Sequence, residues 1–201
     1  MRSKRPSPAS ADQRVKICID IDNVIARTDE VMRDVIRLHS GVDLRYEEVT
    51  EFDYWQCKDS AGRCLPKGEW SAVHLEFTVN HLHRIEPVEN IQSHLVQLRS
   101  YFDVHLATSR LPQGHDLTRA WLERHGIPFD IDKLHFVGHR EKHKIPHSFA
   151  IAVEDDREQA LLFLEQGVQP FLLAHPWNVV ASELGIRRVS NWLELLDVVM
   201  S

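Results

Sequence analysis

Residues 15–23 form a short apolar run that ends in two aspartates, Asp20 and Asp22, one position apart. Alternate residues of a β-strand point to opposite faces, so these two carboxylates share a face where the strand passes into a loop. Two carboxylates held together repel each other unless a cation lies between them or their pKa values are driven apart. An apolar strand can also end in Asp simply to begin a turn. The pair therefore predicts either a cation-binding strand end or a turn.

Two later apolar stretches also end in polar side chains. Residues 102–107 are followed by Thr108, Ser109 and Arg110, and residues 149–153 are followed by Glu154, Asp155 and Asp156. Strands that alternate with helices indicate a parallel sheet with helices on both faces. In such sheets ligands bind outside the carboxyl ends of the strands. We therefore expect these three groups of side chains to meet at one edge of the sheet.

The rest of the chain fits this α/β pattern. A first helix is expected from residue 28, with Thr28 as its N-cap and Gly41 at its end, and the last sheet strand is expected at residues 171–174. Further helices are expected at residues 87–98, 116–125 and 160–167, and a further strand at residues 134–137. The stretch 42–84 differs, because it is rich in aromatic residues and shows no strand alternation. We expect a tail without fixed structure at 1–14, a core at 15–30 and 85–201, and a small, mostly helical cap insertion at 31–84.

Composition limits the classes of function. The chain has 201 residues, 43% of them hydrophobic and 27% charged, as in a soluble globular protein. Its formal net charge of -6 argues against a protein that coats nucleic acid in general. Its apolar stretches are too short to cross a membrane. The first fourteen residues lack the apolar core of a signal peptide, and the three cysteines make an odd number. We therefore expect a cytoplasmic protein.

The converging side chains suit phosphoryl transfer through a carboxylate. One carboxylate attacks phosphorus, a cation offsets the repulsion between that nucleophile and the phosphate, and hydroxyl and ammonium groups bind the phosphate oxygens. A second acid handles the proton of the leaving group. A site made of oxygen ligands favours Mg²⁺ over zinc.

These residues resemble the haloacid dehalogenase (HAD) superfamily of phosphohydrolases. The first motif, DxDx[TV][LV], matches residues 20–25 with Ile25 in the last place, the second matches the strand that ends at Thr108, and the fourth matches residues 153–155. Within the superfamily the chain is most similar to the 5'(3')-deoxyribonucleotidases and their bacterial relatives. Residues 108–110, 121–129 and 175–178 carry that similarity, which extends over about residues 14 to 200. The resemblance implies a Rossmann-like fold with a cap after the first motif.

The resemblance also implies roles for single residues. Asp20 would be the nucleophile and a magnesium ligand, and Asp22 would be the general acid and base, with its backbone carbonyl on the metal. Asp155 would be the remaining protein ligand of magnesium, and Glu154 would support it. Asp156 is the less favoured substitute for Asp155. The phosphate-binding residues would be Thr108 and Ser109 together with Lys142 or Lys144, both of which suit the motif lysine.

Two positions depart from the family pattern. Asn23 stands where many relatives have glycine, and Asn tolerates the left-handed backbone that such a turn requires. His175 stands where relatives often have Asp, and the sequence leaves open whether it changes substrate contacts or only the turn. Ser109 and Arg110 either bind phosphate or cap the next helix and pair on the surface.

Two further interpretations concern side chains of the insertion. Trp55, Trp70 and Phe77 either pack the cap or stack on a nucleobase. A zinc site is conceivable among the Cys and His residues of the insertion, although none of the usual ligand spacings is present. That site would draw on Cys57, Cys64, His74, His81 and His83.

The sequence thus predicts a Mg²⁺-dependent phosphatase of small phosphomonoesters, and the resemblance makes a nucleoside monophosphate the expected substrate. A polynucleotide 3'-phosphatase, a receiver-like domain and an inactive phosphate-binding protein are the alternatives. We expect a small phosphorylated molecule as the partner and no association with a membrane. The sequence leaves open whether the protein forms a homodimer.

Overall fold

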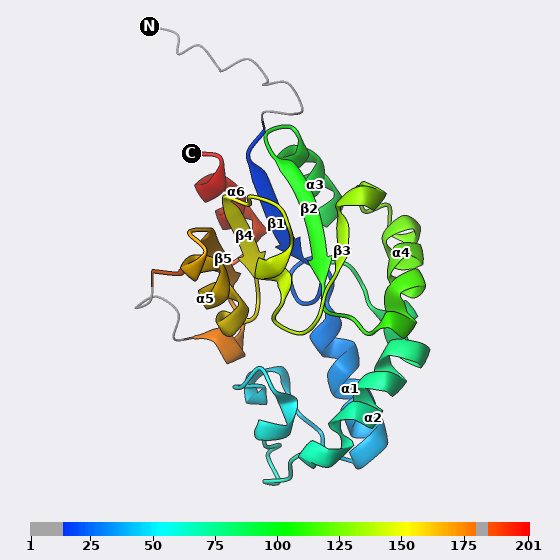
Figure 1. The fold of residues 1–201 in the computed structure, drawn as a ribbon. Coiled ribbons are helices and arrows are strands. Elements are labelled where there is room, and N and C mark those ends of the chain that lie inside the picture. Colours follow the sequence, from blue (N-terminus) through cyan, green and yellow to red (C-terminus); the bar gives the residue numbers. More distant parts are fainter. Residues whose placement is uncertain (1–13, 180–184) are drawn as a thin grey trace, which may run out of the picture.

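The computed structural model describes residues 14–179 and 185–201. Of the expected N-terminal tail, residues 1–14, all but Arg14 lie outside the described residues. Figure 1 shows a sheet with helices around it and a group of helical segments below the lower ends of its strands.

The core is a six-stranded parallel sheet with the strand order β3-β2-β1-β4-β5-β6. The first strand, β1, lies in the middle, and the order reverses on either side of it. This arrangement places a switch point in strand order at the end of β1, where doubly wound folds bind their ligands. The strands are β1 (Lys16–Asp20), β2 (Asp103–Thr108), β3 (Leu134–Phe136), β4 (Ile151–Glu154), β5 (Gln169–Leu173) and β6 (Arg187–Val189).

Both faces of the sheet are covered, as a parallel sheet requires. Ile17 and Ile19 of β1 are fully buried on one face, in a core shared with α3, α4 and α6. Cys18 points to the other face, where it packs with Phe163 of α5. The helices are α1 (Thr28–Ser40), α2 (Trp70–Glu76), α3 (Ile91–Arg99), α4 (His115–Arg124), α5 (Arg157–Glu165) and α6 (Trp192–Val199). The predicted α/β class is confirmed.

The segment between β1 and α3 is helical, as expected, and is called the helical segment below. After α1 it contains α2, a π-helical turn at Phe77–His81 and several short 3₁₀ turns. Figure 1 shows these elements beside the ends of the strands, away from the N-terminal end of the sheet. Gly41 ends α1 in the left-handed conformation, with φ 72°, which a side chain would disfavour. The division into a core and a cap at residues 31 and 84 stays a prediction.

The end of the chain differs from the expectation. Residues 171–174 were expected to be the last strand, but β6 follows and pairs with β5. β6 begins with Arg187 and Arg188 and has only three residues, so it shows no apolar run. The sequence pattern also missed α6, whose Leu195 is fully buried. The helix expected from residue 87 begins at Ile91, because Asn90 takes a left-handed conformation before it.

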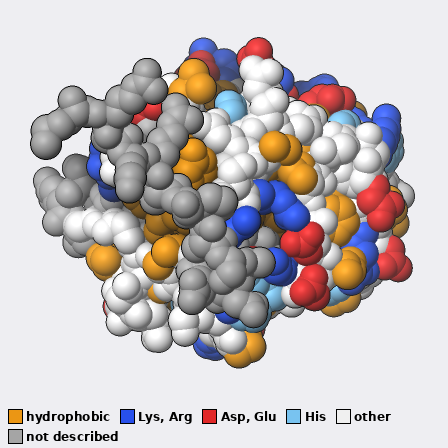
Figure 2. All heavy atoms as spheres, turned by 90° about the horizontal axis from the view of Figure 1, so that it is seen from above, with side chains coloured by type: hydrophobic (Ala, Val, Ile, Leu, Met, Phe, Trp, Pro, Cys, Tyr) orange, Lys and Arg blue, Asp and Glu red, His pale blue; other side chains and the backbone are white. Residues whose placement is uncertain are grey.

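The face at the N-terminal ends of the strands has a mixed surface character. Figure 2 shows this face, where acidic and basic side chains are interspersed with apolar and uncharged ones.

Leu95 and Val96 of α3 provide a matched test of this packing. Leu95 is fully buried, whereas the neighbouring Val96 is 57% exposed. Leu95→Ala should lower the free energy of unfolding by about 2–5 kcal/mol, because it leaves a cavity beneath the sheet. Val96→Ala should change it by less than about 0.5 kcal/mol. Urea unfolding followed by circular dichroism measures both, and equal effects would contradict the position of α3.

Candidate active site

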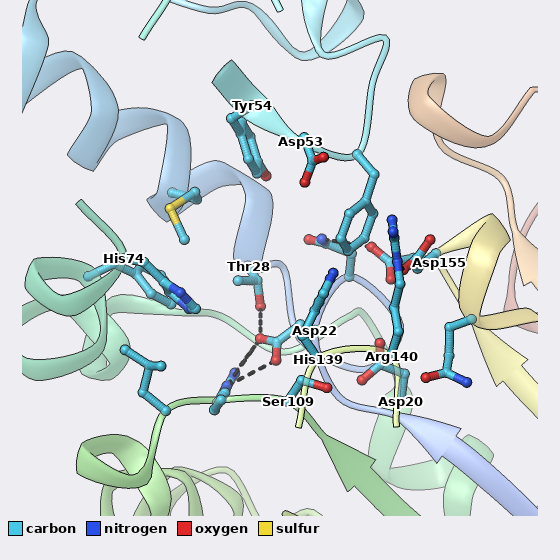
Figure 3. Close-up of a pocket in the computed structure, with 18 of the residues that line it drawn as sticks. Asp20, Asp22, Thr28, Asp53, Tyr54, His74, Ser109, His139, Arg140 and Asp155 are labelled. Atoms are coloured by element: carbon cyan, nitrogen blue, oxygen red, sulfur yellow. Dashed lines mark hydrogen bonds and ion pairs between the residues drawn. The ribbon is translucent and has the colours of Figure 1, made fainter. Parts of the chain in front are cut away.

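The predicted site residues converge at the carboxyl ends of the central strands. Asp20 ends β1, Thr108 ends β2, and Asp155 follows β4 directly. A cavity of about 650 Å³ lies at these strand ends, with the helical segment on its other side. Figure 3 shows Asp20, Asp22 and Asp155 on the core side of this cavity and Asp53 and Tyr54 opposite them. The expectation that distant acidic strand ends meet is therefore confirmed.

Asp20, Glu154 and Asp155 form a buried acidic cluster. Each contributes a carboxylate oxygen, and these atoms lie within 4.8 Å of one another. Burial raises the pKa of all three carboxyl groups, and repulsion from neighbouring carboxylates raises it further, whereas Lys142 lowers it. One oxygen, Glu154 Oε1, is buried without a hydrogen-bond partner. The cluster thus has excess negative charge and an unused ligand atom.

Lys142 is the cation that faces this cluster. Its Nζ lies 2.7 Å from Asp20 Oδ2 and 3.0 Å from Glu154 Oε2. Burial alone would lower the pKa of Lys142, but these two carboxylates raise it well above its usual value, so the ammonium stays charged. Lys144, the other predicted lysine, is exposed and pairs with Glu141 at 2.8 Å. The fold therefore brings Lys142, and not Lys144, to Asp20.

Asp22 points toward a different cation. Arg110 Nη2 lies 2.8 Å from Asp22 Oδ1, and the hydroxyls of Thr28 and Thr108 donate to the same carboxylate at 2.6 and 3.0 Å. Figure 3 shows the contacts of Asp22 with Thr28 as dashed lines. Burial would raise the pKa of Asp22, but Arg110 and the two hydroxyls outweigh it and lower the pKa. The predicted N-cap role of Thr28 is wrong, because its hydroxyl is used by Asp22 and caps no backbone group.

The turn after Asp22 depends on Asn23. Its φ is 57°, so the left-handed conformation predicted at this position is confirmed. Its side-chain amide donates to Asp155 Oδ2 at 3.0 Å, and its side-chain oxygen accepts from the Asp29 backbone at 2.7 Å. A glycine could adopt the same turn, but it could not orient Asp155.

His175 connects the turn to the helical segment. Its Nε2 lies 2.8 Å from the Asn23 carbonyl oxygen, and its Nδ1 lies 2.9 Å from the Tyr46 hydroxyl. The ring stacks on Trp177, with centroids 4.4 Å apart. Burial lowers the pKa of His175 to about 4, so the ring is neutral and must donate from only one nitrogen. The nitrogen at the carbonyl carries the proton, so the nitrogen at Tyr46 accepts from its hydroxyl. His175 therefore acts on the turn.

Ser109 and Arg140 lie along the cavity wall. The Ser109 hydroxyl donates to the Gly138 carbonyl at 3.1 Å, which joins the end of β2 to the segment after β3. Arg140 Nε binds Asp156 Oδ2 at 2.8 Å, and its guanidinium lies over the Phe52 ring, 5.6 Å from the centroid. Asp156 also caps α5 through the Glu158 backbone N–H.

Sequence reasoning missed parts of this site. Arg110 was weighed only as a phosphate-binding or surface residue, and Arg140 and Phe52 were not considered as site residues. The sequence signal for Arg110 was its place directly after the strand-end pair Thr108 and Ser109. Arg140 has a weaker signal, which is its position two residues before Lys142.

The aromatic residues of the helical segment divide into two groups. Trp70 stacks with Tyr54 and with His74, at centroid distances of 5.7 and 5.5 Å, and Phe77 is only 2% exposed. These two residues pack the segment, although parts of them also line the cavity. Trp55 and Phe52 line it as well and are only partly buried.

The donor set fits a hard divalent cation. The acidic cluster offers carboxylate oxygens and one orphaned oxygen, without sulfur or imidazole, as Mg²⁺ prefers. Among the described residues, the groups of three ligand atoms within 4.8 Å include no residue of the insertion. The zinc site conceived there is therefore not assembled by the fold.

Residues 13–201 match the model of a protein family described as 5' nucleotidase, deoxy (pyrimidine), cytosolic type C. The chain belongs to this family. A putative nucleotidase of Bacillus subtilis, YqfW, is 30% identical over 91 residues, which are 45% of this chain and 47% of that protein. The match thus spans about half the length of this curated relative.

Solved structures share the fold at low sequence identity. A haloacid dehalogenase-like hydrolase of Streptococcus pneumoniae has 16% identity and a TM-score of 0.64, covering 92% of this chain and 98% of that one. A HAD family hydrolase of Deinococcus radiodurans, crystallised with bound phosphate and sodium, has 16% identity and a TM-score of 0.65, covering 92% and 94%. These likenesses show that the chain has the fold of the HAD-like hydrolases. In the part that the structure describes, no helix is both long and apolar enough for a membrane crossing.

Asp155 and its neighbour Asp156 provide a matched test of the predicted metal ligand. Asp155→Asn should abolish most of the rise in melting temperature that Mg²⁺ causes, because it removes a charge from the acidic cluster. Asp156→Asn should retain the rise, because Asp156 lies outside the cluster and Asn still caps α5. At a hundredfold excess of Mg²⁺ over its Kd the stabilisation should be about 2.7 kcal/mol. Differential scanning calorimetry with and without Mg²⁺ measures it, and a full rise in Asp155→Asn would contradict the assignment.

Proposed function

We propose that this protein is a Mg²⁺-dependent phosphatase that hydrolyses (deoxy)nucleoside 5'-monophosphates through an aspartyl-phosphate. The observation that carries the proposal is the position of Asp20, a buried carboxylate between Lys142 and the acidic pair Glu154 and Asp155 at the floor of a cavity. Membership of the nucleotidase family supports the substrate class.

Asp20 is the proposed nucleophile. Its Oδ1 accepts from the Ile21 backbone N–H at 2.6 Å and its Oδ2 binds Lys142, so the carboxylate is fixed in orientation. One of these oxygens attacks phosphorus, and the bond from phosphorus to the ester oxygen breaks. Water then attacks the phosphorus of the aspartyl-phosphate, which releases phosphate and restores Asp20. Two displacements in sequence leave the enzyme unchanged after each turnover.

Asp22 is the proposed general acid and base. In the free protein Arg110 and two hydroxyls lower its pKa. The dianionic phosphate adds negative charge beside Asp22, which raises the pKa and favours the protonated form that the leaving oxygen needs. In the second step the carboxylate takes a proton from the attacking water. Arg110 is a positioning residue here, because its Nε and Nη2 hold the Asp22 carboxylate by hydrogen bonds.

The groups around Asp20 are the proposed phosphate ligands. Bound to Asp20, Asp155 and the Asp22 carbonyl, Mg²⁺ would neutralise charge on the phosphate and the nucleophile. We place the Lys142 ammonium among the phosphate ligands, together with the Thr108 and Ser109 hydroxyls. Each hydroxyl would exchange its present hydrogen bond, to Asp22 or to the Gly138 carbonyl, for one to phosphate. Glu154 holds Lys142 in place by the 3.0 Å ion pair.

The opposite wall of the cavity suits a planar leaving group. Phe52 and Trp55 line it, and Arg140 provides a cation beside Phe52. A nucleobase can stack on such rings, while the sugar hydroxyls reach polar groups nearer the floor.

The three cysteines are free in the structure, which supports the proposed cytoplasmic location.

The two candidate lysines allow a controlled test of the chemistry. Lys142→Met should lower kcat/KM for thymidine monophosphate by about 100-fold or more, because a buried cation beside the nucleophile is lost. Lys144→Met should leave it within about twofold, because its ammonium is exposed and pairs with Glu141. Asp20→Asn should lower it by about a thousandfold or more. Phosphate release with and without Mg²⁺ measures all three.

Several results of that assay would contradict the proposal. They are activity retained in Asp20→Asn, equal effects of the two lysine variants, and no turnover of any deoxynucleoside monophosphate. Faster turnover of a 3'-phosphorylated oligonucleotide would instead favour a polynucleotide phosphatase. A long-lived phosphoaspartate after acetyl phosphate treatment would favour a receiver-like protein.

Phe52 tests the proposed base contact. Phe52→Leu should raise KM for nucleoside monophosphates by about 5- to 150-fold, the range that corresponds to a lost stacking contact of about 1–3 kcal/mol. For glycerol phosphate, which has no ring, KM should stay within about twofold. Steady-state kinetics on both substrates provides the comparison, and an equal rise for both would reject the stacking role.

A further inference from the structure

We propose that His105, His135 and His147 form a second metal site, which binds a divalent first-row transition metal such as Zn²⁺. One ring nitrogen from each residue lies within 4.8 Å of the others. None of the three lines the cavity at the acidic cluster, and the proposed phosphatase chemistry uses none of them.

The strand register brings two of these histidines together. His135 of β3 is the register partner of Ala107 on β2, and His105 lies two residues before Ala107, so both side chains share one face of the sheet. His105 Nδ1 lies 2.9 Å from His135 Nε2. His147 comes from the segment between β3 and β4, and its ring centroid lies 4.6 Å from that of His105. In Figure 1 this segment returns along one face of the sheet to the start of β4.

Three imidazoles and no carboxylate in direct reach suit a transition metal better than Mg²⁺. A set of three protein ligands leaves a further position for water.

The surroundings of His105 provide a second observation. This residue is 2% exposed, and its Nε2 is buried without a hydrogen-bond partner. The carboxylate oxygen nearest to that nitrogen is Asp103 Oδ2 at 3.5 Å, and Asp103 is held by Lys133 at 2.8 Å. A metal on Nδ1 would leave the proton on Nε2, 3.5 Å from Asp103 Oδ2. Carboxylate, histidine and metal in this order are the usual arrangement of a metal-ligating histidine.

A cavity reaches one of the three histidines. A second cavity is lined by His135, Phe136 and Pro146, beside the segment that carries His147. Metal binding would join β2, β3 and the segment that carries Lys142, five residues before His147. We therefore expect the metal to stabilise the fold around that segment without contacting the reacting atoms.

The test uses the full chain after treatment with a chelator, in buffer with excess Mg²⁺ to occupy the acidic cluster. Isothermal titration with Zn²⁺ should show one tight site, and Co²⁺ should give the visible absorption of a tetrahedral complex. His135→Gln/His147→Gln should lose both signals, as should His147→Gln alone if the double variant fails to fold. His83→Gln, a change at an exposed histidine outside the cluster, should keep both.

Two more variants make the result specific. Asp103→Asn should weaken Zn²⁺ binding by about 10- to 100-fold, the usual effect of removing the carboxylate behind a ligating histidine. Asp155→Asn should keep tight Zn²⁺ binding. The proposal is overturned if wild type and His135→Gln/His147→Gln bind Zn²⁺ equally, or if Asp155→Asn removes the tight site. These readouts do not involve hydrolysis, so they are independent of the proposed activity.

Discussion

The buried charge at the end of β1 is the constraint on which the structure of the site depends. Asp20, Asp22, Glu154 and Asp155 bring four carboxylates to one edge of the sheet. Lys142 and Arg110 supply two cations, which leaves two negative charges unmatched if every carboxyl group is ionised. Burial and repulsion raise the pKa of the three clustered carboxyl groups for this reason. One divalent cation would match the deficit and restore the ionised, nucleophilic form of Asp20.

The two cations divide the acids into groups with different environments. Lys142 pairs with the clustered carboxylates, whereas Arg110 and two hydroxyls bind Asp22. The pKa of Asp22 is therefore lowered, while the pKa of Asp20 is raised. Two carboxylates whose environments separate their pKa values can take different roles in one reaction. Asn23, His175 and Tyr46 extend this arrangement through the turn to the helical segment. The helical segment, which carries the wall proposed to contact the leaving group, is thereby connected to the turn after Asp22.

Much of this could be predicted from the sequence, because apolar strands that end in acids or hydroxyls have a clear pattern. The sheet edge at Asp20, Thr108 and Asp155 follows from that pattern and from the topology rule for parallel sheets. The choice between Lys142 and Lys144 could not be made, because a 3₁₀ turn decides which of them points inward. The partner of Arg110 was missed, since an ion pair across 88 residues leaves no local signal. β6 was missed because an edge strand of three residues needs no apolar run.

The most direct measurement is a crystal structure of the protein with Mg²⁺ and beryllofluoride, a mimic of the phosphoryl group. The account predicts the mimic bonded to a carboxylate oxygen of Asp20, Mg²⁺ bound by Asp20 and Asp155, and the Lys142 ammonium in contact with the mimic. A mimic on another residue, or Mg²⁺ bound away from Asp155, would contradict it.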